Sequence, residues 1–146
     1  MITRLHNMAT QTKYRRGFSL VELMIVVVIT GILASIGIAI FNKNIMEAKR
    51  TEAVSAIGTI RRQLRLYYAA ESTYPLAPAF TQVVGKPWND INPGELTGKY
   101  FADKHYRYRS YDGVAYRIKC QTAGLLDKNI WIDEAGNWKF NVEDGE

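Results

Sequence analysis

The sequence predicts an α+β fold in which a long N-terminal helix packs, through its second half, on a C-terminal antiparallel sheet. Two observations predict it: an uncharged run over residues 23–41 that continues into an amphipathic helical pattern, and a C-terminal half in which apolar and polar residues alternate. The chain has 146 residues, of which 47% are hydrophobic, so it is long enough for one compact domain besides the extended helix.

The first seventeen residues form a basic segment. They contain four cations and no acid, against a net charge of +5 for the whole chain, so the remaining residues are almost neutral. A short basic arm explains the charge, and we do not expect nucleic acid as a partner. The four cations are Arg4, Lys13, Arg15 and Arg16.

The uncharged run is long enough to cross a membrane. Its nineteen residues would span about 28 Å as a helix, close to the thickness of a bilayer core. A signal peptide has an apolar region of only about 7 to 15 residues, and the rest of the chain is too small to enclose a helix that is apolar on all sides. A membrane or the core of a filament therefore remains as the place where this helix could be buried. The cations before it predict that the N-terminus lies in the cytoplasm.

Glu22 stands at the beginning of this run. A carboxylate beside lipid is costly unless it is paired, neutralised or placed at an interface. One interpretation is a helix-start acid that interacts with the helix dipole at headgroup level. The other is a carboxylate that needs a specific cation as its partner.

The residues around Glu22 favour the second interpretation. The basic pair Arg15 and Arg16, then Gly17, Phe18 and, four residues later, Glu22, lead directly into the apolar helix. This arrangement resembles the start of type IV pilins, including their relatives in secretion systems. The resemblance runs from Arg15 to about Arg65 and implies the ladle-shaped pilin fold. It implies a cleaved leader over 1–17, a membrane or filament-core helix half over 18–41, and a domain over 42–146.

The resemblance also implies roles for three residues. A membrane-bound prepilin peptidase would cut after Gly17 and methylate the new amino group of Phe18. Glu22 would then pair with the amino terminus of a neighbouring subunit during assembly, although Phe18 and Glu22 are four apart and could also pair within one subunit. The implied partners are identical subunits in a helical filament, the peptidase, the assembly platform, minor pilins and, before assembly, the inner membrane.

The chain also departs from the family pattern. Ala39 stands where many pilins have a proline, so a kink at that position is not expected, while Gly31 and Gly37 could supply flexibility or packing space. Many pilins have a C-terminal disulfide, but Cys120 is the single cysteine here and cannot form one within the chain.

The helical pattern continues beyond the uncharged run. An apolar stripe predicts one helix over residues 18–72, roughly 80 Å long. All four prolines then fall in the predicted connecting loop, 73–98, where we expect contacts specific to the filament. The stripe comprises Ile45, Val54, Ile57, Ile60, Leu64 and Tyr67, and the arginines at 61, 62 and 65 are expected on a solvated face.

Two hairpins follow. A three-residue loop ending at Gly113 would pair Tyr108 with Tyr116 and Tyr106 with Ile118, with the intervening arginines outward. A similar loop ending at Gly136 would pair Ile132 with Trp138 and Ile130 with Phe140. The same alternation explains the interleaved tyrosines and arginines of 106–111 without a nucleic-acid site.

We expect no catalytic set, cofactor or metal site. Cys120 falls on the inward face with no histidine or acid suitably placed, so it reads as a packed thiol. The C-terminal acids lack the spacing of a calcium loop and are expected on a hairpin tip and a solvated tail. These acids are Asp133, Glu134, Glu143, Asp144 and Glu146.

The sequence therefore predicts a structural subunit of a type IV pilus filament, which acts in motility or adhesion. The subunit would reside in the inner membrane before assembly and afterwards on the cell surface. Two alternatives remain open: the major pseudopilin of a type II secretion system, which shares every N-terminal feature, and a single-span, membrane-anchored binding domain that is never cut.

Overall fold

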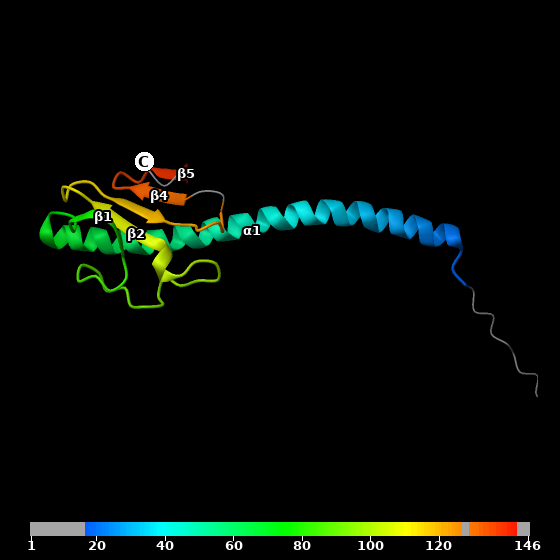
Figure 1. Ribbon diagram of the computed structural model, residues 1–146, viewed down its shortest axis with the longest axis horizontal. Helices are drawn as coiled ribbons and strands as arrows, with labels where there is room; N and C mark the ends of the chain where they lie inside the picture. The colour runs from blue at the N-terminus through cyan, green and yellow to red at the C-terminus, as the bar shows by residue number, and fades with distance from the viewer. Residues whose placement is uncertain (1–16, 127–128, 143–146) are drawn as a thin grey trace, which may run out of the picture. The chain divides into compact units, whose positions relative to one another are not determined.

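The computed structural model describes residues 17–126 and 129–142 (Figure 1). One helix, α1 (Leu20–Glu71), is followed by an antiparallel sheet and a short 3-10 helix, η1 (Asp103–His105), which confirms the predicted α+β class. The chain divides into two units, residues 1–40 and 41–146, and α1 contributes to both. The strands are β1 (Ala77–Gln82), β2 (Tyr106–Ser110), β3 (Arg117–Cys120), β4 (Asn129–Asp133) and β5 (Trp138–Val142).

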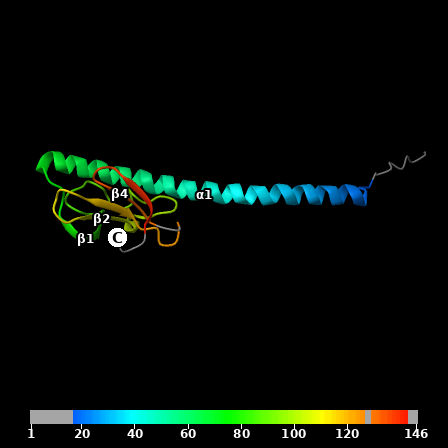
Figure 2. The same cartoon turned by 90° about the horizontal axis from the view of Figure 1, so that it is seen from above.

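The second half of α1 supplies one wall of the core in the unit 41–146. The helix buries four side chains that recur every three or four residues, as one face of a helix requires. Three of them, Ile57, Ile60 and Leu64, belong to the predicted stripe, and the fourth is Ala53. In Figure 2 the strands lie together on one side of this part of the helix.

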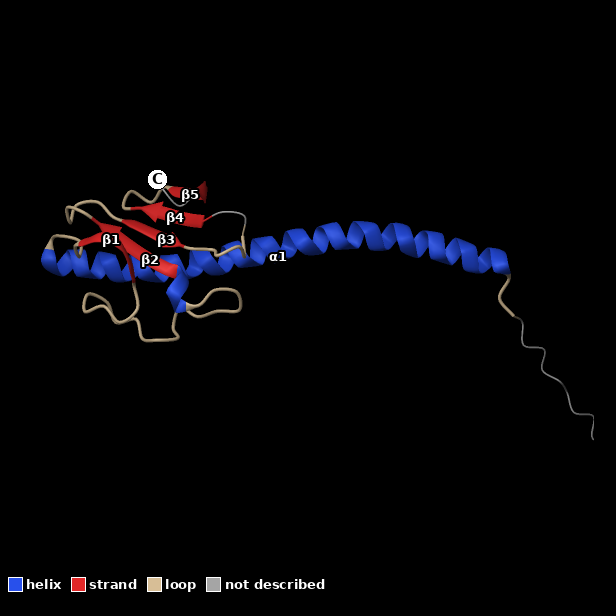
Figure 3. Cartoon of the chain, in the orientation of Figure 1, coloured by secondary structure: helices blue, strands red, loops and turns tan. Residues whose placement is uncertain are grey.

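The five strands form one antiparallel sheet in the order β1-β2-β3-β4-β5 (Figure 3). Along β2 and β3 buried and half-buried residues alternate, because successive side chains point to opposite faces of a strand. The inward tyrosines and outward arginines predicted for β2 are confirmed. The inward side chains that pack in the core are Tyr106, Tyr108, Tyr116, Ile118, Cys120, Ile130 and Ile132.

The predicted register of the first hairpin is wrong by two residues. Tyr108 lies opposite Ile118 and Tyr106 opposite Cys120, whereas the sequence predicted Tyr116 and Ile118 as their partners. A shift of two residues leaves every side chain on the predicted face. The connection between β2 and β3 is longer than the predicted three-residue loop because side chains within it form their own hydrogen bonds.

Three polar contacts shape that connection. The Ser110 hydroxyl donates to the Ala115 carbonyl at 2.6 Å, and one Asp112 carboxylate oxygen accepts from the Val114 and Ala115 amides at 2.9 and 3.0 Å. The loop is also tied to the segment after α1, since the Tyr74 amide donates to the Gly113 carbonyl at 2.7 Å. A contact so distant in sequence cannot be read from a turn pattern.

The second hairpin is confirmed. Ile130 lies opposite Phe140 and Ile132 opposite Trp138. Gly136 has φ +92°, a conformation that glycine adopts without strain, and its amide donates to the Asp133 carbonyl.

The segment 73–98, predicted as a connecting loop, contains strand β1. This strand pairs with β2 at the edge of the sheet, and its register is irregular between Ala77 and Thr81. Pro78 falls within this irregular stretch. An edge strand with an irregular register tolerates proline because few ladder hydrogen bonds are lost there.

Candidate processing and assembly site

The residues at the start of α1 are exposed. Gly17, Phe18 and Ser19 precede the first helical residue, Leu20, so the helix begins two residues later than predicted. Phe18 is 80% exposed. The peptide bond between Gly17 and Phe18, which the resemblance implies is cut, therefore lies in an exposed segment before the helix rather than inside a helical turn. Residues 1–16 of the predicted leader lie outside the described residues.

The Glu22 carboxylate turns back over the first turn of the helix. Its Oε2 accepts a hydrogen bond from the Ser19 backbone amide at 2.9 Å, and the Ser19 carbonyl accepts from the Leu23 amide. Serine followed three residues later by glutamate is a capping-box sequence, and this contact is the glutamate half of that motif. The Ser19 role was missed from the sequence, although the serine and glutamate spacing could have shown it.

This arrangement leaves Glu22 able to bind a cation. A carboxylate accepts about four hydrogen bonds, and the described residues supply one. The carboxylate also lies at the positive end of the helix dipole, which stabilises its charge. An amino group created at Phe18 would lie one residue before the Ser19 amide that Glu22 already contacts.

The helix that follows is apolar on every side. From Leu20 to Ile40 every residue is exposed, and the best 18-residue window of α1 has a mean hydropathy of 2.8. The two hydroxyls in the run are satisfied within the helix: Thr30 donates to the Val26 carbonyl at 2.8 Å and Ser35 to the Ile32 carbonyl at 2.7 Å. Apart from Glu22, no polar side chain of this run needs water, which suits burial in lipid or among other helices.

Cys120 belongs to the sheet unit, residues 41–146. Its thiol is fully buried between the sheet and α1, and burial, with the nearby Glu52 charge, raises its pKa to about 12. A protonated, buried thiol is a packing group and a poor nucleophile. The prediction for its position on the inward face is confirmed.

The other predicted residues lie in the sheet unit. Arg61 is half-buried: its Nε donates to the Tyr116 hydroxyl at 3.3 Å, while Arg62 and Arg65 are exposed as predicted. Asp133 binds the β4–β5 turn through Asn137, and Glu134 is exposed at its tip. Glu143, Asp144 and Glu146 lie outside the described residues, and within the described ranges no three metal-binding side chains gather.

An exposed junction before an apolar helix, an acid in its first turn and an α+β frame together define a pilin-like protein. Comparison with known proteins agrees: residues 12–38 match the family described as the prokaryotic N-terminal methylation motif. That match spans Gly17, Phe18 and Glu22.

The most informative similarities extend well beyond the helix. The type II secretion system core protein G of Dickeya chrysanthemi is 41% identical over 143 residues, covering 90% of each chain. The protein of the same description from Aeromonas hydrophila is 35% identical over 89% of this chain and 96% of its own. That from Pectobacterium carotovorum subsp. carotovorum is 40% identical over 74% of this chain and 69% of its own. The chain therefore belongs to the family of type II secretion system core protein G. No solved structure gives a significant match.

Proposed function

We propose that this chain is the major pseudopilin of a type II secretion system, a structural subunit that is processed and then assembled into a filament below the outer membrane. The observation that carries the proposal is the similarity to core protein G over 90% of both chains. It favours the alternative that the sequence left open over the type IV pilus subunit. The similarity extends across the sheet, whereas the N-terminal pattern is common to both kinds of filament.

The assembly mechanism follows from the first turn of α1. Cleavage after Gly17 by a prepilin peptidase would remove the basic leader and create a cation at Phe18. The Glu22 carboxylate, now bound to the Ser19 amide, would pair with the amino terminus of a neighbouring subunit. A charge pair between apolar helices sets the axial register, because any other alignment leaves a charge unpaired.

The chain would begin in the inner membrane with its leader in the cytoplasm. The helix half over residues 18–41 would then pass from lipid to the filament interior, and both environments are apolar. Assembly would require the peptidase, an assembly platform and minor pseudopilins as partners. The proposed role is mechanical and involves no catalysis.

Processing is tested by the intact mass, with N-terminal fragmentation, of the protein extracted from membranes of its host. We expect a chain that starts at a methylated Phe18. A bulky substitution at Gly17 should leave uncut precursor in the membrane. A mature protein that keeps residues 1–17 would instead indicate the single-span anchored domain.

Assembly is tested by Glu22→Ala. This variant should be cleaved normally, yet form no filaments and fail to restore export of enzymes into the medium in a strain lacking the wild-type gene. Glu47→Ala is the matched control, because it removes the next acid along α1, which makes only an exposed ion pair with Arg50 at 3.7 Å. Normal filaments from Glu22→Ala would refute the pairing role. Abundant sheared surface filaments at native expression would favour the type IV pilus.

A further inference from the structure

The face of the sheet that points away from α1 carries a set of cations. We name it the basic face and define it by five residues, Arg107, Arg109, Arg117, Lys119 and Lys139. Aromatic rings lie between them. The Arg109 guanidinium carbon lies 4.5 Å from the centre of the Phe80 ring and 4.7 Å from that of the Tyr111 ring. The Arg117 guanidinium carbon and the Lys139 Nζ lie 4.8 and 5.5 Å from the centre of the Trp131 ring.

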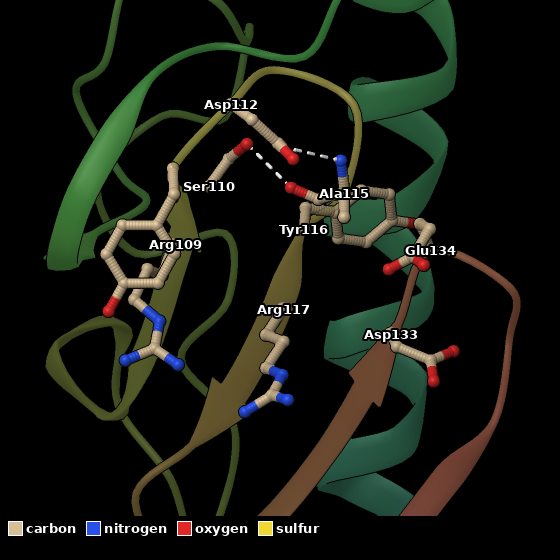
Figure 4. A pocket seen from close by; sticks show the side chains of 9 residues that line it. Arg109, Ser110, Asp112, Ala115, Tyr116, Arg117, Asp133 and Glu134 are labelled. Atoms are coloured by element: carbon tan, nitrogen blue, oxygen red, sulfur yellow. Dashed lines mark hydrogen bonds between the residues drawn. The ribbon is translucent and has the colours of Figure 1, made fainter. Parts of the chain in front are cut away.

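Two pairs of like charges face each other across β2 and β3. Arg109 lies directly opposite Arg117, and Arg107 directly opposite Lys119. In Figure 4 the guanidinium groups of Arg109 and Arg117 lie on the same side of the sheet, away from Asp112. Like charges placed directly across an antiparallel pair destabilise a sheet, so the fold alone does not explain this arrangement.

The nearby carboxylates form no ion pair with these arginines within 4.0 Å in the described residues, although Asp133 lies directly opposite Arg117 across β3 and β4. A hollow of about 300 Å³ beside Arg109 and Arg117 is also lined by Asp112, Asp133 and Glu134. Asp112 accepts the amides of its own loop, and Asp133 binds the turn through Asn137. In the ranges that the structure describes, the one ion pair within 4.0 Å is Arg50 with Glu47, so Arg107, Arg109, Arg117 and Lys139 have no carboxylate at that distance.

The covered ring of Trp131 favours a carboxylate partner over nucleic acid, and it leaves Tyr111, which is 65% exposed, as the open ring beside Arg109. Trp131 is only 5% exposed because Arg117 and Lys139 lie over its ring. Single-stranded nucleic acid binds by stacking its bases on free aromatic rings, and the Trp131 ring has no free face for a base. An extended acidic peptide needs only cations at intervals along a strand.

The chain itself contains such a peptide. Directly after β5 the segment 143–146 carries Glu143, Asp144 and Glu146 and no cation. We propose that the segment 143–146 of one copy docks on the basic face of a second copy in the assembled filament. This rests on the proposed function, because assembly is what brings the copies together.

The arginine pair of the same copy lies beyond the reach of the segment's backbone, so the proposal takes the arginine pair of a second copy as the partner. Val142 lies opposite Asn129, three strands and four residues from Arg109. With strands about 4.8 Å apart and about 3.3 Å per residue, the two Cα atoms are roughly 20 Å apart. Four extended residues span about 14 Å, so the backbone of the segment falls short of the arginine pair in its own copy.

Disulfide trapping tests the contact. Gln82 is exposed and lies opposite Arg107, so Gln82→Cys combined with Glu146→Cys places thiols on the two proposed partners. The native Cys120 is buried and should not react. Mild oxidation of assembled filaments should give a ladder of covalent dimers and larger species. Gln82→Cys with Glu95→Cys, whose second thiol is on the exposed loop that contains Asn92, is the control and should give monomer.

Charge reversal then identifies the cations. Adding Arg109→Glu and Arg117→Glu should reduce the ladder about tenfold or more, and adding Glu143→Arg and Asp144→Arg to that variant should restore it. Arg109→Gln with Arg117→Gln should give a smaller loss if the reversed pair folds poorly. Lys99→Glu with Lys104→Glu makes the same change in net charge away from the basic face and should leave the ladder unchanged.

Each other outcome is decisive. Filaments without a ladder overturn this proposal alone, whereas a wild-type chain that never forms filaments overturns the proposed function and this proposal with it. A disulfide that closes within one chain shows that the segment folds back on its own copy. If reversing the arginine charges abolishes the disulfide ladder but substituting residues 143–146 does not, the basic face binds another acidic protein instead.

Discussion

Glu52 holds the loop before η1 against α1, and its replacement should be the most damaging single change to a charged residue in the sheet unit. One carboxylate accepts three consecutive backbone amides: Oε2 accepts from Lys99 at 3.0 Å, and Oε1 from Tyr100 at 2.9 Å and Phe101 at 2.7 Å. Phe101 is 1% exposed, so this loop anchors a core side chain.

The expected loss in the free energy of unfolding can be calculated from these hydrogen bonds. A hydrogen bond to a charged group contributes about 1.5–3 kcal/mol, and the exposed Lys99 amide can bind water instead. Counting the other two amides at the lower value gives a loss of about 3 kcal/mol for Glu52→Ala. Glu52→Gln keeps one acceptor oxygen and loses the charge, so about half that loss is expected. The total free energy of unfolding of a typical domain is only about 5–15 kcal/mol, so this loss would be a large fraction of it.

Urea unfolding of the full chain in detergent micelles measures this loss. All three tryptophans lie in the sheet unit, so their fluorescence reports its unfolding. Glu47→Gln is the control, with an expected change below about 0.5 kcal/mol, because Glu47 makes only an exposed ion pair. If Glu52→Ala unfolds within about 0.5 kcal/mol of the wild type, the carboxylate clamp contributes little and the argument fails.

Two further predictions concern backbone conformation and pH. Gly113 and Gly124 both have positive φ, +72° and +84°, but a Cβ at Gly113 would overlap the Thr73 hydroxyl, while Gly124 has open space. Gly124→Ala should therefore cost about 1 kcal/mol and Gly113→Ala at least about 2 kcal/mol in the same urea experiment; equal losses would contradict the overlap. Burial raises the pKa of Cys120 to about 12 from 9.0 and raises the pKa values of Tyr106, Tyr108 and Tyr116. The unfolded chain loses these protons first, so stability is full below about pH 9 and falls as pH rises toward 12. Unfolding midpoints at pH 7 and 10.5 should show this fall, and Cys120→Ala should reduce it; a flat profile would count against burial of these groups.

Much of the fold was predictable because local patterns determine it. Continuous apolarity over 23–41 and the stripe through Ile57, Ile60 and Leu64 identify one helix, since both follow from the helical period. Alternation along β2 and the glycine-closed turn before β5 identify strands and their faces in the same way. The candidate site could be proposed from the sequence because Gly17, Phe18 and Glu22 lie within six residues of one another, so the proposal needs only the start of α1 and the residues just before it.

The tertiary structure decided what depends on distant contacts. The register of β2 on β3 follows from a loop that bonds to Tyr74, and β1 forms because an edge position tolerates Pro78. The Glu52 clamp joins residues almost fifty positions apart. The two like-charge pairs of the basic face likewise exist only because that register aligns Arg109 with Arg117. Local periodicity therefore determined the class and the helix of this protein, and a short motif before the helix led to the proposed processing site. Packing between distant segments decided register, loop anchoring and the charge pattern of the sheet's outer face.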